Sequence, residues 1–141
     1  AVFPKIRFKL SIGNLAFAVS DYTIAGSSTL TLDSSTTPAI SVDGGRTATI
    51  SANLGGLYGL EKTGAGKLVF TGTKSYTGLT TVTGGTLELS GATAGVAQIH
   101  GSVLVNPGAT LAFTNGDGTG FGFYNNPATS IAVDGGRTLA L

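Results

Sequence analysis

The stretch from Gly59 to Ser90, GLEKTGAGKLVFTGTKSYTGLTTVTGGTLELS, decides the fold. It contains two short segments with in/out alternation, residues 67–70 and 86–89, and a glycine-rich turn precedes each of them. Side chains alternate along a strand, so Leu68 and Phe70 share one face, as do Leu87 and Leu89. The stretch therefore predicts two strands built from one turn-then-strand unit.

Composition predicts a single all-β domain spanning residues 1–141. Charged residues make up 11% of the chain, against roughly 25% in an average domain. Glycine accounts for 23 of the 141 residues, about twice its usual share of roughly 7%. The hydrophobic fraction of 41% argues against disorder and supplies one core.

The turn-then-strand unit recurs along the chain. The first inward positions of the predicted strands are Leu30, Ala48, Leu68, Leu87, Leu111 and Leu139. The second inward positions are Leu32, Ile50, Phe70, Leu89, Phe113 and Leu141. Successive members lie 18, 20, 19, 24 and 28 residues apart, and the hexapeptide Val-Asp-Gly-Gly-Arg-Thr occurs at both 42–47 and 133–138.

Constant strands joined by spacers of variable length are typical of a parallel β-solenoid. Each coil stacks on the previous one at about 4.8 Å, so like residues lie over like. We expect about six coils. The alternative is an antiparallel β-sandwich, which explains the alternation equally well but neither the repeated hexapeptide nor the two columns.

The central stretch resembles the autotransporter-associated β-strand repeat of bacterial autotransporter passengers and related surface proteins. The resemblance rests on residues 60–68, 76–78, 80–82 and 85–87. Lys74 departs from it, because that turn usually has a small polar residue such as Asn before the tyrosine. The resemblance implies a right-handed parallel β-helix, secreted across a Gram-negative-type envelope and displayed on the outer membrane or released. It also implies a scaffold whose activity resides in inserted loops or separate domains.

Charge and hydropathy exclude several partners. The net charge of +1 argues against nucleic acid, which requires a basic patch. Lys5, Arg7 and Lys9 alternate with apolar residues and predict the polar face of a strand over residues 6–12. No apolar run approaches the roughly 20 residues of a membrane helix, so we expect no membrane insertion of this segment. The absence of cysteine excludes disulfides and thiolate metal sites.

The first 20 residues do not have the pattern of a signal peptide, and we expect them to form a cap or an edge strand. The chain contains no methionine. We therefore expect it to be a processed piece or a fragment of a longer surface protein.

No catalytic, cofactor-binding or metal-binding residue is predicted. His100 is the only histidine and lies on a polar face. Asp43 and Asp134 occupy equivalent Gly-Gly turns, where hydrogen bonding within the turn explains them better than a glycosidase pair. Arg46 and Arg137 follow the same turns without the acid cluster of a polysaccharide lyase. The other acids are Asp21, Asp33, Glu61, Glu88 and Asp117.

Three further segments have structural explanations. Residues 115–120 lack the tandem pattern or alternating acids of a calcium loop and predict an outward loop. Residues 64–67 lack the spacing of a phosphate loop, and no helix follows. Phe121, Phe123 and Tyr124 are expected to pack on the solenoid flank rather than to form a ligand patch, and Tyr76 is expected to be structural.

These observations predict a non-catalytic structural or adhesive module of a secreted bacterial surface protein. The expected partners are further copies of itself, in oligomers or filaments, and glycans or a neighbouring cell surface. Self-assembly is expected because the sequence ends on Leu141 inside a predicted strand without a charged cap. The alternative is a polysaccharide-binding or polysaccharide-degrading β-helix protein.

Overall fold

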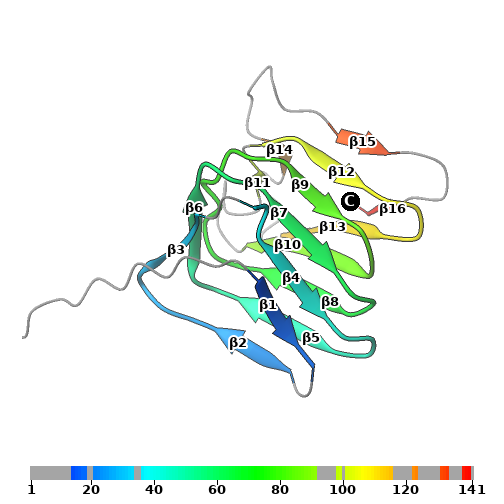
Figure 1. Ribbon diagram of the computed structural model, residues 1–141, viewed down its shortest axis with the longest axis horizontal. Helices are drawn as coiled ribbons and strands as arrows, with labels where there is room; N and C mark the ends of the chain where they lie inside the picture. Colours follow the sequence, from blue (N-terminus) through cyan, green and yellow to red (C-terminus); the bar gives the residue numbers. More distant parts are fainter. Residues whose placement is uncertain are drawn as a thin grey trace, which may run out of the picture.

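The computed structural model describes residues 14–18, 21–33, 36–91, 98–99, 101–115, 122–123, 131–133 and 138–140. The secondary structure of these residues is entirely β, and each strand pair in the three sheet ladders below is parallel (Figure 1). The protein is a parallel β-solenoid, as predicted, and the antiparallel sandwich is wrong. The predicted strand over residues 6–12 lies outside the described residues.

Two parallel sheets of six strands each form the body of the described solenoid. The first contains, in spatial order, β1 (Asn14–Phe17), β4 (Ala39–Val42), β7 (Leu60–Thr63), β9 (Thr80–Val82), β12 (Val103–Val105) and β15 (Ile131–Val133). The second contains β2 (Tyr22–Ile24), β5 (Thr47–Ile50), β8 (Lys67–Phe70), β10 (Thr86–Gly91), β13 (Thr110–Asn115) and β16 (Thr138–Ala140). One strand from each sheet, joined by a short turn, makes a coil.

The solenoid has about four turns, fewer than the six expected. The expected number treats every strand pair as a full coil. In the sheet order, β1 and β2 at one end and β15 and β16 at the other have a neighbour on one side only. The four pairs between them are stacked on both sides.

The interior of the second sheet is the aliphatic column that alternation predicts. Leu87 pairs with Leu68 on one side and with Leu111 on the other, and Leu68 pairs with Ala48. These four side chains are fully buried. On the outer face of this sheet, Lys67 and Glu88 form an ion pair, which at a partly exposed site contributes at most about 1 kcal/mol.

The first member of each predicted column is wrong. Leu30 and Leu32 pair with Leu54 and Gly56, whereas Tyr22 and Ile24 occupy the positions beside Ala48 and Ile50. Both segments alternate, and the spacing near 20 favoured the more aliphatic one. The true occupants lie in an outer strand, where Tyr22 is exposed and Ile24 half-buried, so less apolar residues suffice.

Leu30 and Leu32 belong to a third side of the solenoid, at the left of Figure 1. Here β3 (Thr29–Leu32) pairs with β6 (Asn53–Gly56), and the ladder continues through a parallel bridge between Leu54 and Lys74. A separate described pair joins β11 (Gln98–Ile99) to β14 (Gly122–Phe123). The third side is therefore less regular than the two six-stranded sheets.

Close backbone approach explains the glycine turns between the two sheets. A Cβ at Gly66 would lie 2.2 Å from the carbonyl oxygen of Asp43 in the preceding coil. The Gly66 amide instead donates to Val42 O at 2.8 Å, and Thr86 N donates to Gly66 O at 3.1 Å. Without a side chain at this position, consecutive turns stack at hydrogen-bonding distance.

Candidate functional site

Several residues singled out from the sequence lie outside the described part of the chain. These are His100, Asp117, Asp134, Arg137, Phe121, Tyr124 and Lys5, Arg7 and Lys9. Phe123 and Asn115 are described as parts of β14 and β13, without their side chains.

The Asp43 turn is held by the main chain. Arg46 N donates to Asp43 O at 3.1 Å, and Asp43 N donates to Phe17 O in the preceding coil, also at 3.1 Å. The side chains of Asp43 and Arg46 are both exposed. Among the described residues no three His, Asp or Glu side chains come together in a way that suits a metal ion.

Tyr76 is structural, as predicted. Its side chain is buried, and its hydroxyl lies 2.8 Å from Thr80 Oγ1. Burial raises the pKa of Tyr76 to about 12, although the hydrogen bond to Thr80 acts in the opposite direction. The ring thus fills the interior next to the third side and leaves no exposed hydroxyl for chemistry.

Lys62 is a buried lysine in the first sheet that the sequence analysis missed. It occupies the inward column between Ile40 and Val82, two aliphatic residues. Its Nζ donates to Thr63 O at 2.6 Å, to Gly64 O at 2.9 Å and to Gly84 O at 3.1 Å. The Gly84 contact joins two consecutive turns, because residue 84 belongs to the next coil.

Lys74 is a second buried lysine, on the third side. Its Nζ donates to Gly72 O at 2.8 Å, and its backbone bridges to Leu54. Lys74 is the residue at which the sequence departs from the family pattern. Its placement shows that the turn accommodates a long side chain by directing it into the interior.

Burial lowers the pKa of both lysines from 10.5 to about 8. Such a shift brings an amine toward the range used by nucleophilic or basic lysines. Neither side chain is accessible, however, since Lys62 is 0% and Lys74 1% exposed, and both amines are engaged by carbonyl oxygens. Alternation was the available signal: Lys62 is two residues from Leu60, and Lys74 is two residues from Tyr76, so each shares a face with a buried residue.

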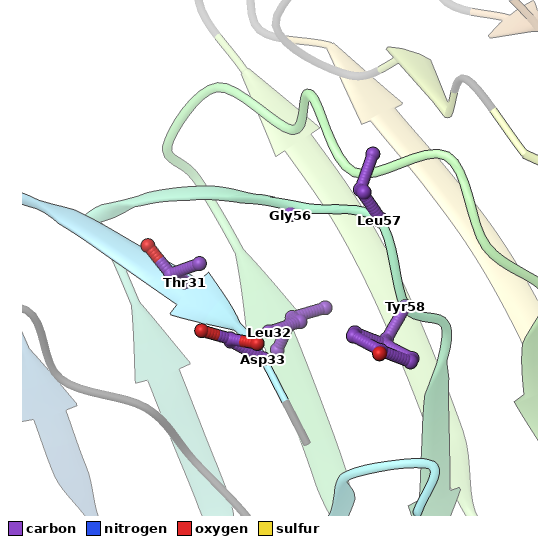
Figure 2. Close-up of a pocket in the computed structure, with 6 residues that line it drawn as sticks. All are labelled: Thr31, Leu32, Asp33, Gly56, Leu57 and Tyr58. Atoms are coloured by element: carbon purple, nitrogen blue, oxygen red, sulfur yellow. The ribbon is translucent and has the colours of Figure 1, made fainter. Parts of the chain in front are cut away.

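A shallow pocket of about 200 Å³ lies on the third side (Figure 2). Its lining comes from the end of β3 and from the segment that follows β6, namely Thr31, Leu32, Asp33, Gly56, Leu57 and Tyr58. The Tyr58 ring is turned toward Leu32 and Asp33, whereas Leu57 is directed away from them (Figure 2). Sequence reasoning did not bring these segments together, because it placed β3 in the wrong sheet.

Exposed apolar side chains gather near this pocket. The large hydrophobic residues that are exposed within the described part of the chain are Tyr22, Leu57, Tyr58 and Leu79. Leu57 and Tyr58 line the pocket, and Leu79 belongs to the stacked segment of the next coil, where its carbonyl oxygen accepts from Leu60 N at 2.9 Å. This corner of the third side is thus the part of the described surface best suited to contact a ligand.

Comparison with known families identifies the centre of the chain. A model of the passenger-associated-transport-repeat matches residues 60–89, which run from the start of β7 into β10. The chain carries a passenger-associated transport repeat. This repeat provides the buried Lys62, the Gly66 turn and the Tyr76–Thr80 contact, and it agrees with the resemblance found in the sequence.

The adhesin BmaC autotransporter of Brucella suis biovar 1 (strain 1330) is 35% identical to this chain over 108 residues. The match covers 73% of the chain but 3% of that protein, so the chain spans a small part of this curated relative. No solved structure matches the chain significantly. Both matches, through the repeat and through the adhesin, point to the passenger region of an autotransporter. No described helix is long and apolar enough to cross a membrane.

Proposed function

We propose that the chain is a non-catalytic structural and adhesive module of a surface protein of a Gram-negative bacterium. The observation that carries the proposal is the passenger-associated transport repeat, which forms the stacked middle coils of a regular parallel solenoid. A matching protein is an adhesin, and that name supports the adhesive part of the proposal. In this reading the two six-stranded sheets hold the module rigid, and its outward segments make contact with the neighbouring surface.

The character of the polar groups supports a role in binding rather than in turnover. The two most perturbed amines, Lys62 and Lys74, are held inside by carbonyl oxygens. A polysaccharide-degrading β-helix requires an acid pair or an acid cluster beside a base on one accessible face. The described acids instead occupy separate places, with Asp43 in a turn and Glu88 on the second sheet.

Adhesion is tested with beads coated with the 141-residue chain. We expect these beads to bind extracellular-matrix proteins or cultured epithelial cells more than albumin-coated beads do, and the soluble chain to compete. Binding no greater than that of the albumin-coated beads would contradict the adhesive part. Incubation with a panel of polysaccharides should release no new reducing ends. Turnover that is lost in Asp33→Asn or Glu61→Gln would favour the enzymatic alternative.

Self-association into oligomers or filaments is the second part of the proposal. Among the described residues, β1 and β2 are the outer strands of their sheets, and an outer strand presents backbone groups that another strand can pair with. We expect the mass measured by light scattering to increase with protein concentration. A constant monomer mass up to millimolar concentration would contradict this part and leave the adhesive part intact.

A further inference from the structure

The pocket on the third side exists because the β3–β6 ladder ends there. Leu32 is the last residue of β3 and pairs with Gly56, the last residue of β6. Gly56 has a φ of +123°, and a Cβ at this position would lie 2.4 Å from Leu32 O. Glycine therefore allows the two strands to stay paired up to their final residue, and the pocket opens directly beyond it.

Two side chains of different character border the opening. Asp33 follows β3, and Tyr58 follows β6 at the same end of the ladder. Figure 2 shows the tyrosine ring on one side of the opening, with Leu32 and Asp33 on the other. Tyr58 is 43% exposed, so part of its ring and its hydroxyl are available to a ligand.

An aromatic ring, a carboxylate and a hydroxyl around a small pocket form the combination that recognises a sugar unit. The C–H face of a pyranose packs on an aromatic ring, and its hydroxyl groups donate to carboxylate oxygens. Tyr58 supplies the ring, Asp33 the carboxylate and Thr31 a hydroxyl. The volume of about 200 Å³ lies below the range of about 300–1,000 Å³ of typical small-molecule sites, which suits one unit of a chain better than a whole cofactor.

The charge of the pocket argues for a neutral sugar. Asp33 is the only charged residue among the six that line it, so an acidic sugar would be repelled. Asp33 already has a partner within the protein. A sugar hydroxyl adds a single hydrogen bond to such a carboxylate, whereas a lysine or arginine side chain would compete with the existing partner for its charge.

We infer that the pocket formed by Thr31, Asp33 and Tyr58 binds one unit of a neutral oligosaccharide. The inference rests on the proposed adhesive function and deepens it, because it gives the module a place and a chemical class of ligand. The exposed Leu57 and Leu79 extend the apolar surface beside the site toward the next coil. Neighbouring units of the same oligosaccharide then lie across the stacked coils.

The test uses amide shifts of the isotope-labelled 141-residue chain. The probes are cello-, manno-, xylo- and chito-oligosaccharides, with an oligolysine peptide as the competing class of ligand. We expect at least one oligosaccharide at millimolar concentration to shift the amides of residues 31–33 and 56–58. Shifts caused by the peptide alone, or by none of the probes, would overturn the inference.

Four variants decide whether the pocket is responsible. Tyr58→Ala should weaken binding at least tenfold, Asp33→Asn should weaken it several-fold, and Tyr58→Phe should change it less than threefold because the ring remains. Tyr22→Ala is the matched control, since Tyr22 is 45% exposed and lies in β2, outside the pocket. Circular dichroism confirms that each variant is folded.

Binding that is unchanged in Tyr58→Ala would overturn the site. The readout is independent of the bead assay. Adhesion without a sugar-dependent shift would overturn this inference alone, and a sugar-dependent shift without adhesion would overturn the adhesive function alone.

Discussion

The two six-stranded sheets and the third side of the solenoid are built from the same chain, but under different constraints. In the sheets every inward position is stacked between like positions, and even Lys62 is held there by three carbonyl oxygens. On the third side the ladder is short, ending at Leu32 and Gly56, and Leu57 and Tyr58 are exposed. The difference teaches that stacking secures the sheets, whereas the third side has freedom to present side chains.

The largest contrast should come from removing apolar side chains. Phe70 is fully buried in β8, and Phe70→Ala should lower the free energy of unfolding by about 3–5 kcal/mol through a cavity between the sheets. Leu57 is 83% exposed on the third side, and Leu57→Ala should change it by less than about 0.5 kcal/mol. Urea unfolding followed by circular dichroism measures both. Equal losses would contradict the comparison.

Glycine substitutions should separate the two regions next. A Cβ at Gly66 meets the Asp43 carbonyl oxygen at 2.2 Å, a backbone atom that cannot easily yield, so Gly66→Ala should cost about 2–4 kcal/mol. At Gly55 on the third side the nearest atoms are side-chain atoms of Thr29 and Ser75 at 3.1 and 3.2 Å, which can move. Gly55→Ala should cost about 1 kcal/mol or less. A greater loss at Gly55 than at Gly66, in thermal or urea unfolding, would refute the argument.

The buried lysines offer a smaller and more specific contrast. Lys62→Met keeps a side chain of similar length but removes the donor of three carbonyl oxygens, so we expect a loss of about 1–3 kcal/mol. Lys74→Met removes the hydrogen bond to Gly72 O and relieves the burial of a charge, and it should cost about 1 kcal/mol or less. Unfolding of both variants at pH 7 provides the test. A Lys74 variant less stable than the Lys62 variant would show that the carbonyl cluster is not what holds the turn.

The smallest effect should be a pH dependence. Burial lowers the pKa of Lys62 and Lys74 to about 8, while in the unfolded chain both keep their proton up to about 10.5. Above pH 8 the unfolded state therefore binds more protons than the folded state, and stability rises with pH. We expect a gain of about 1 kcal/mol per lysine between pH 7 and 9, below the range in which tyrosines titrate. The Lys62→Met, Lys74→Met double variant should show a flatter profile, and a parent chain that loses stability over this interval would contradict the expectation.

The regular sheets could be predicted from the sequence because alternation and stacking determine them together. Leu68, Leu87 and Leu111 repeat at nearly constant spacing, and each pairs as expected. The third side could not be predicted in the same way. Its strand β6 contains Gly55 and Gly56, which carry no apolar signal, and its continuation is a single bridge at Lys74.

The candidate pocket depends on that same side. Asp33 and Tyr58 come together only because β3 pairs with β6, and the sequence gave Leu30 and Leu32 an equally good place in the second sheet. Alternation identifies which residues face inward, but it does not distinguish between sheets when two alternating segments compete. The spacing of 20 residues was therefore informative within the repeat and misleading before it.

The stacking of like positions has a consequence for how such a chain acquires its structure. The hydrogen bonds between coils around the repeat span 20 to 22 residues, as those from Thr73, Thr83 and Lys62 show. Loop-closure entropy depends on this separation and not on the total length. Each coil therefore needs only the previous one as a template, and a finished edge directs the next segment into register. The entropic cost of adding a coil is the same for the tenth as for the second, which makes very long proteins of this kind feasible.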